Sequence, residues 1–316
     1  MTILVTGATG FVGRHVVRAL ASRGLRARGL VHERPLSADA PAEAMHGDLR
    51  APATLEAACA GVQCVVHLAS IVADDDATCQ ATNVRGTENL LAACRARGVG
   101  SVVYLGNSAV CGYNVQRDVT EDTARIAPAT PVSRSRLAAE SLVVAAGGCS
   151  LRTLFTYGEG DTYFVPRLVR TLARLPFLVA GGRARLSLIG VDQLAERIAA
   201  VVSRLIFGAP ALEGRVFHVN DGEPTSLRAI VAVLVRELGL RRPRLSLPYA
   251  MARALMRIAP GTGAWTESAA HRLYLVSTDH TFDASRIARV VGPLADPGGF
   301  GDRFAKHAAW YRGVLA

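Results

Sequence analysis

The chain has 316 residues, of which 50% are hydrophobic and 20% charged, and a formal net charge of +10. So much apolar sequence can bury a large core, which excludes a disordered tail or an extended scaffold. The positive charge would suit a polyanion, but the arginines are dispersed and the densest cluster, at 241–244, has no interleaved aromatic residues. We therefore expect no nucleic-acid partner.

The sequence also indicates where in the cell the protein is expected. The opening MTILVTG enters an apolar run without a basic region, and no apolar stretch approaches the ~20 residues of a membrane span. The six cysteines are scattered, with no CxxC pair and no clustering with histidine. This pattern is typical of reduced core thiols, so we expect a cytoplasmic protein without a metal site or membrane contact.

Short apolar runs alternate with helical patterns up to about residue 158. Strands are predicted at 3–5, 28–31, 64–69, 101–106 and 150–155, with helices between them that include one from Thr130 to about Ala146. This alternation predicts an α/β fold of the Rossmann type, a doubly wound parallel sheet with right-handed crossovers.

The rhythm changes after Gly158. The pattern predicts a helix at 162–173, strands near 177–180 and 185–189, a helix at 192–202, a strand at 216–219 and then mainly helices, with loops at 207–224 and 258–264. We interpret 1–158 as a dinucleotide-binding domain, to which 185–220 returns. Residues 159–316 are expected to form a smaller, interleaved carboxy-terminal lobe that binds substrate.

The strongest motif is TGATGFVG at 6–13. Gly7 allows a tight turn, Gly10 lets the backbone approach a pyrophosphate, and Gly13 lets helix and strand pack closely. The phosphates would then lie at the positive end of the helix. We expect Thr9, Phe11 and Val12 of the same loop to contact the dinucleotide.

The end of the second strand, VHERP, distinguishes the two nicotinamide cofactors. An acid there accepts the ribose hydroxyls of NAD, whereas a base pairs with the phosphate of NADP. His32 and Arg34 favour NADPH, with Arg14 nearby, whereas Glu33 leaves NADH as the alternative.

Further segments carry a family resemblance: GDLR at 47–50, VVHLAS at 65–70, NVRGTENLLAAC at 83–94, SRSRLAAE at 133–140 and LIGVDQLAERIAA at 188–200. With the glycine motif they resemble the extended short-chain dehydrogenases/reductases, up to about residue 240. The resemblance implies that Asp48 and Leu49 border the adenine and that Asn83 is structural. It also implies that the cofactor runs along Leu68, Ala69 and Ser70.

The catalytic positions of that family are altered. By the resemblance, its serine or threonine falls on Asn107 and its Tyr-x-x-x-Lys pair falls on Val132 and Arg136. Arg136 can still hold the nicotinamide ribose, but it does not release a proton near neutrality. Asn107 can donate a hydrogen bond to a developing oxyanion, although it cannot deliver a proton.

One explanation for the altered positions is that the proton donor has moved to another residue. Ser108 and Tyr113 follow the predicted strand at 101–106 and Tyr157 follows that at 150–155, where each could face substrate or equally be a wall residue. His67 lies inside an apolar strand and is expected to be a hydrogen-bonded core residue.

The other explanation is that a group of the substrate itself polarises the ketone carbonyl. If a phenol or enol hydroxyl flanks the ketone, an internal hydrogen bond replaces the missing side chain. This favours an NAD(P)H-dependent reductase of quinone-like polycyclic ketones, and the altered positions resemble the atypical ketoreductases of actinomycete antibiotic pathways that act on angucyclinone polyketides. The alternatives are a catalytically silent cofactor-binding regulator, whose pocket would be filled by side chains, and a nucleotide-sugar epimerase or dehydratase.

The carboxy-terminal lobe should decide the substrate. A sugar enzyme would need diphosphate-binding arginines, for which Arg167, Arg183, Arg185 and Arg253 are available. A flat aromatic substrate would instead need apolar walls, and the candidates are Tyr163, Phe164, Pro166, Leu186, Tyr249 and Trp265. The superfamily resemblance also implies a homodimer built from helix pairs.

Overall fold

A parallel sheet of seven strands organises the computed structural model, which describes residues 1–174, 177–208, 212, 214–258, 267–294 and 298–315. All neighbouring strands run parallel, in the order β12-β7-β5-β4-β1-β2-β3. The expected Rossmann-type doubly wound fold is confirmed. The strands are β1 (Thr2–Thr6), β2 (Arg26–Val31), β3 (Ala42–His46), β4 (Cys64–His67), β5 (Ser101–Asn107), β7 (Cys149–Thr153) and β12 (Val216–His218).

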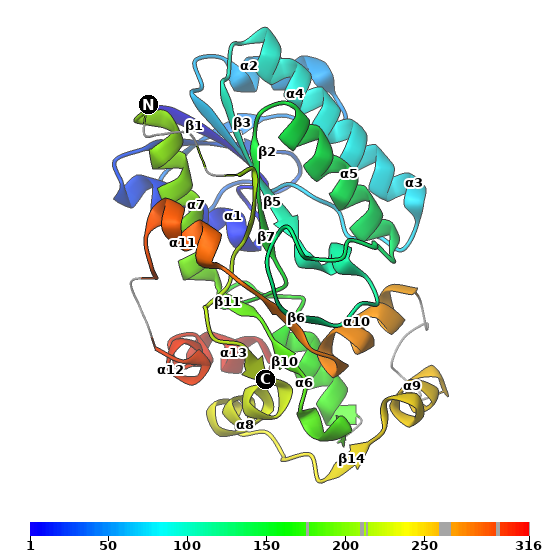
Figure 1. The fold of residues 1–316 in the computed structure, drawn as a ribbon. Coiled ribbons are helices and arrows are strands. Elements are labelled where there is room, and N and C mark those ends of the chain that lie inside the picture. Colours follow the sequence, from blue (N-terminus) through cyan, green and yellow to red (C-terminus); the bar gives the residue numbers. More distant parts are fainter. Residues whose placement is uncertain (175–176, 209–211, 213, 259–266, 295–297, 316) are drawn as a thin grey trace.

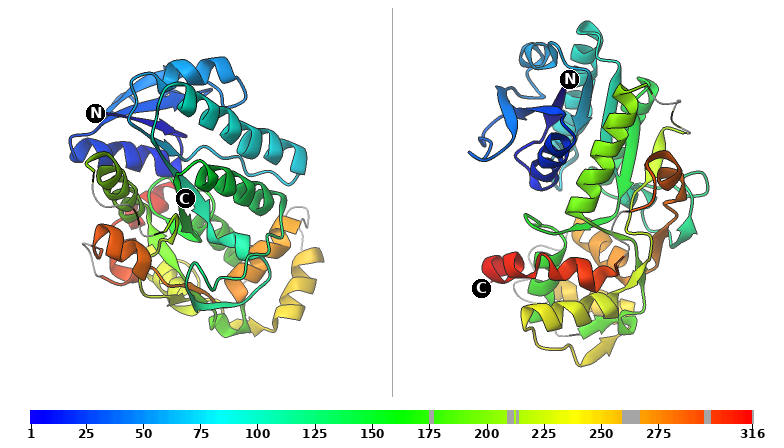
Figure 2. Two further views of the ribbon diagram at one scale, coloured as in Figure 1. Left: turned by 45° about the horizontal axis from the view of Figure 1, so that its top comes forward. Right: turned by 90° about the vertical axis from the view of Figure 1, so that its left-hand side faces the viewer.

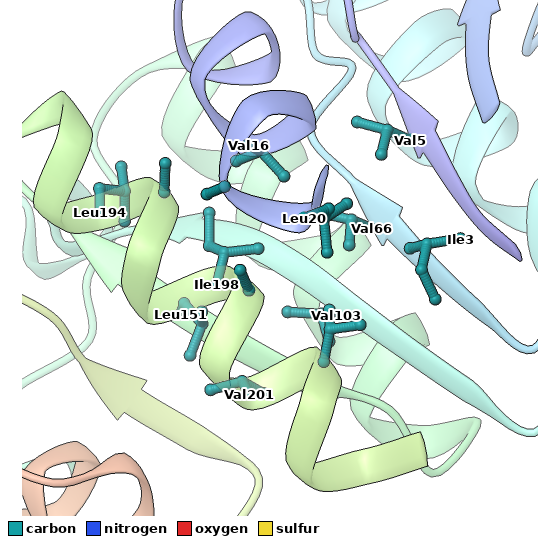
Figure 3. Packing of buried hydrophobic residues seen from close by; sticks show 14 of the residues in the cluster. Ile3, Val5, Val16, Leu20, Val66, Val103, Leu151, Leu194, Ile198 and Val201 are labelled. Atoms are coloured by element: carbon teal, nitrogen blue, oxygen red, sulfur yellow. The ribbon is translucent and has the colours of Figure 1, made fainter. Parts of the chain in front are cut away.

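Helices cover both faces of this sheet (Figure 1). Helices α1 (Phe11–Ser22) and α7 (Val191–Ile206) pack on one face, where Val16, Leu20 and Ile198 meet apolar strand residues such as Val66 and Val103 (Figure 3). The other face is covered by α2 (Pro52–Cys59), α4 (Gly86–Ala96) and α5 (Pro131–Ala145). This burial of two apolar faces by amphipathic helices is the main stabilising feature of the domain.

Helix α5 begins where its sequence predicts. The Thr130 side chain accepts a hydrogen bond from the backbone of Ser133, whose hydroxyl in turn accepts from the backbone of Thr130, and Pro131 occupies the first turn. Three successive acids, Asp74, Asp75 and Asp76, lie at another helix start, since Asp75 caps α3 (Asp76–Cys79). A π-helical turn, Gln80–Arg85, joins α3 to α4.

A smaller lobe lies at the end of the sheet away from the N-terminus (Figure 1 and the right panel of Figure 2). In the described residues it contains two two-stranded sheets, β8 (Phe155–Tyr157) with β11 (Leu188–Gly190) and β9 (Phe177–Val179) with β14 (Leu245–Leu247). A third sheet has four strands, in the order β13 (Thr225–Ser226), β10 (Arg185–Leu186), β15 (His280–Phe282) and β6 (Gln116–Val119). Its helices are α6 (Val165–Arg174), α8 (Leu227–Leu238), α9 (Tyr249–Ile258), α10 (Glu267–Ser277), α12 (Phe300–Ala305) and α13 (Ala308–Leu315).

The chain passes more than once between the large sheet and the lobe. Helix α7 and strand β12 return to the large sheet, whereas β10 joins the lobe and β6 leaves the first half of the chain to pair with β15. Helix α11 (Ser285–Val291) packs back against α7. The expected strand at 150–155 is divided into β7 and β8, and most of the expected loop at 258–264 lies outside the described residues.

All six cysteines are buried with free thiols. Among the helices in the described ranges, none is long and apolar enough to span a bilayer.

Candidate active site

A cleft of about 640 Å³ runs from the glycine-rich loop after β1 to the lobe helices α6 and α10. It lies at the carboxyl ends of the parallel strands, where open α/β sheets bind their ligands. All residues that the sequence assigned to the cofactor line this one cleft: Gly7, Thr9, Gly10, Phe11, Val12, Gly13, His32, Arg34, Asp48, Leu49, Leu68, Ala69, Ser70 and Arg136.

The glycine-rich loop has room only for backbone. Gly7 has φ +68°, and a Cβ there would lie 2.9 Å from the backbone nitrogen of Ala69. A Cβ on Gly13 would collide with the carbonyl oxygen of Gly7. Helix α1 starts at Gly10 without a side-chain cap and without an acid in its first turn, so its amino end can receive the pyrophosphate of a dinucleotide.

The end of the cleft beside β2, where the sequence predicts the adenosine, carries charges of both signs. Arg50 donates to Asp48 Oδ2 at 2.9 and 3.1 Å and to Oδ1 at 3.3 Å, and this hydrogen bonding holds the pKa of Asp48 below its usual value. Exposed Arg34 lines the cleft and forms no ion pair with any described carboxylate. Arg34 is therefore available to a phosphate on the adenosine ribose.

We expect Arg34→Ala to raise the KM for NADPH about tenfold or more and to leave the KM for NADH nearly unchanged, because it removes a charge-assisted contact to the phosphate. Steady-state kinetics with both cofactors measures the effect. Arg97→Ala, which breaks a surface contact to Glu56, is the matched control. Equal losses for both cofactors would place Arg34 away from the phosphate.

His67, at the end of β4, and Asn83 are both fixed by hydrogen bonds. His67 is 1% exposed and its ring nitrogens lie 2.8 Å from Thr6 Oγ1 and 2.9 Å from Thr87 Oγ1. Burial, together with the charge of Arg136, lowers the pKa of His67 to about 4, so the ring is neutral at pH 7. His67 is the core histidine that the sequence predicts, and Asn83 is structural because its amide bonds the backbone of Ile71.

The three altered catalytic positions line the same cleft: Asn107, Val132 and Arg136. Asn107 Oδ1 accepts a hydrogen bond of 2.6 Å from the backbone of Ala109, while Nδ2 has no partner among the described residues. Arg136 Nη2 donates to the carbonyl oxygen of Leu105 at 2.8 Å, and its buried Nε has no partner in the part of the chain that the structure describes. Both side chains therefore retain donors for a ligand.

If Arg136 holds the nicotinamide ribose, Arg136→Ala should raise the dissociation constant of NADPH about tenfold, by the loss of charge-assisted hydrogen bonds. Titration calorimetry measures this constant directly. Arg134→Ala on the same helix is the control, since Arg134 is bound to Asp76 at the surface. An unchanged constant for Arg136→Ala would remove this arginine from the cofactor site.

None of the displaced donors suggested by the sequence lines the cleft. Ser108 is 1% exposed and faces His218 Nδ1 at 3.4 Å. Tyr157 is fully buried, donates to Asp221 at 3.0 Å and packs against Phe300. Exposed Tyr113 does not line the cleft, but it packs against His271, which does, and against Tyr274. The lining of the cleft therefore gives no support to the expectation that Ser108, Tyr113 or Tyr157 touches substrate.

Only some of the lobe residues that the sequence assigned to the substrate line the cleft. Tyr163, Phe164 and Arg167 line the cleft, whereas the other expected arginines do not. Pro166 and Leu186 are buried in the lobe, Tyr249 packs with Tyr274, and Trp265 lies outside the described residues. Sequence reasoning missed polar residues that β7, β8 and α10 bring to the cleft: Thr153, Thr156, Ser268, His271 and Arg272.

Comparison with known proteins agrees with this geometry. The 3-beta hydroxysteroid dehydrogenase/isomerase family matches residues 4–249. The chain belongs to this family.

Two curated relatives are ketone reductases. The chain is 28% identical to a 4-hydroxy-2-methyl-3-oxo-4-farnesyl-3,4-dihydroquinoline-1-oxide ketoreductase of Stigmatella aurantiaca, covering 92% of this chain and 91% of the relative. It is 32% identical to a 2-alkyl-3-oxoalkanoate reductase of Stenotrophomonas maltophilia, covering 77% of each.

Among solved structures, the dTDP-glucose 4,6-dehydratase DesIV of Streptomyces venezuelae with NAD bound is similar in fold. Its TM-score is 0.73 at 23% identity, over 99% of this chain and 97% of the dehydratase. The family and the cleft together place the protein among the NAD(P)-dependent oxidoreductases.

Proposed function

We propose that the protein is an NADPH-dependent ketoreductase, able to use NADH, that reduces a ketone of a polycyclic aromatic polyketide of the angucyclinone kind. The observation that carries the proposal is the cleft itself: Val132 lines it where the resemblance places the family's tyrosine, while the cofactor loop is retained and Arg136 replaces the lysine with another cation. The cleft would thus bind and orient a cofactor without a phenol at the position where the family has one.

The cofactor, when bound, supplies a hydride. Arg136 would hold its ribose, and the amide of Asn107 would donate to the ketone oxygen as negative charge develops there. At the ketone, a new C–H bond would form from that hydride, the carbonyl electron pair would move to oxygen, and the neighbouring hydroxyl of the substrate would provide the proton, which water restores. The ketone would be reduced to a secondary alcohol at the expense of NAD(P)H.

One of the two relatives supports a ketone with a neighbouring hydroxyl. The name of the Stigmatella aurantiaca reductase describes a dihydroquinoline with a hydroxyl at carbon 4 beside an oxo group at carbon 3. A regulator should have its pocket filled by side chains, whereas this chain has a cleft of about 640 Å³. A sugar epimerase needs a group that takes and returns a hydroxyl proton reversibly, and Val132 cannot do so.

The test is NADPH oxidation with a tricyclic hydroxyquinone, followed by absorbance and by isolation of the product. We expect one secondary alcohol for each NADPH consumed. Tight NADPH binding without oxidation of any ketone would favour the silent regulator, and conversion of a nucleotide sugar would favour the epimerase or dehydratase. Either result would overturn the proposal.

A further inference from the structure

The lobe side of the cleft carries two arginines from different helices, Arg167 of α6 and Arg272 of α10. Although much of the Arg272 side chain is exposed, desolvation of its guanidinium and the charge of Arg167 both lower the pKa of Arg272. The two positive charges therefore act on one another. Neither arginine forms an ion pair within 4.0 Å with a carboxylate in the described part of the chain, and Asp74 acts on Arg272 only from farther away.

The distribution of acids along the cleft makes this end positive. The carboxylates that line the cleft are Glu33 and Asp48, which both lie at the adenosine end. Arg167 is also held in place, because its guanidinium carbon lies 5.3 Å from the centre of the Tyr163 ring. Two like charges kept together without a carboxylate repel each other, and an anion between them would remove that repulsion.

A buried hydroxyl adds a second, independent observation. Ser268 and Arg272 are four residues apart on α10, so they share the face of the helix that lines the cleft. Ser268 is 8% exposed, and its hydroxyl has no hydrogen-bond partner in the described part of the chain. A buried hydroxyl without a partner is unfavourable, so this one is suited to a ligand.

We propose that Arg167, Arg272 and Ser268 bind a carboxylate carried by the ketone substrate. The proposal rests on the proposed function and deepens it, since it assigns the substrate to the acidic ketones. A carboxylate fits because its two oxygens accept from the planar fork of a guanidinium. A nucleoside diphosphate would also be anionic, but the absence of a phenol at Val132 disfavours the sugar chemistry that such a substrate would undergo.

Binding to the NADPH complex tests the proposal without requiring turnover. The probes are a hydroxyanthraquinone carboxylate, its methyl ester and dTDP-glucose, each titrated by calorimetry. We expect the carboxylate to bind about tenfold or more tightly than the ester. Arg167→Gln and Arg272→Gln should each remove most of that preference while leaving ester binding unchanged. Arg170→Gln, an exposed position on α6 outside the cleft, should leave the preference intact.

Three results would overturn the proposal: equal binding of acid and ester by the wild-type protein, a preference that persists in the Arg167→Gln/Arg272→Gln double variant, or tighter binding of dTDP-glucose than of the acid. Failure of the proposed function is distinguishable from these. In that case no ketone would oxidise NADPH, while arginine-dependent binding of the carboxylate would remain.

Discussion

Asn107→Asp should lower kcat about 10²-fold or more, because it removes the amide that donates to the developing oxyanion. The substitution keeps the shape of the side chain and the oxygen that accepts from the backbone of Ala109 at 2.6 Å. The turn after β5 should therefore persist, and the loss should appear in kcat for the hydroxyquinone rather than in the dissociation constant of NADPH.

Asn107→Ser is the matched variant. Its hydroxyl keeps a donor in the cleft and can cap the same turn, as serine does at many helix starts. We expect most of the activity to remain. Equal losses in the two variants would indicate that this position serves only the local turn, and an active Asn107→Asp enzyme would remove the amide from catalysis.

Glu140→Ala should destabilise the folded protein by about 3–5 kcal/mol, because it leaves a buried guanidinium without its carboxylate. Glu140 is 3% exposed and Arg152 is 6% exposed, and Arg152 Nε donates to the carboxylate at 2.9 Å. The hydroxyl of Ser150 also donates to Glu140, at 2.7 Å. This network joins α5, which carries Val132 and Arg136, to strand β7 beside the cleft.

Urea unfolding, with the free energy extrapolated to water, measures this effect. Glu56→Ala is the control, since it breaks a surface contact to Arg97 and should change stability by less than about 1 kcal/mol. Replacing both partners, as in Glu140→Leu/Arg152→Met, should recover much of the loss because no unpaired charge remains. A Glu140→Ala protein as stable as the wild type would show that the pair contributes nothing to stability.

The cofactor half of the molecule was predictable because its signals are local. The glycine loop, the buried β4 and the start of α5 at Thr130 and Pro131 can each be predicted from a few neighbouring residues. Strand β3 was missed because AEAMH contains no β-branched residue, and it forms by pairing in parallel with β2. Val132 and Arg136 both face the cleft because they are four residues apart on one helix.

The substrate half depends on tertiary packing that the sequence does not encode locally. Tyr157 ends a short strand, as expected, but β8 pairs with β11 and its tyrosine turns into the lobe core. Ser108 is directed to His218 by the turn that Asn107 caps. The polar face of α10 lies beyond about residue 240, where the family resemblance fades, so only the fold brings Ser268 and Arg272 to the cleft.

The most direct test of the account compares kcat/KM for a hydroxyquinone ketone and for its methyl ether at saturating NADPH. Methylation removes the internal hydrogen bond and the proton while leaving the ring system in place. Because the residues that line the cleft include no phenol at Val132, we expect kcat/KM to fall about 10²-fold or more on methylation. Equal turnover of the two compounds would contradict the account, because it would mean that the protein supplies its own acid.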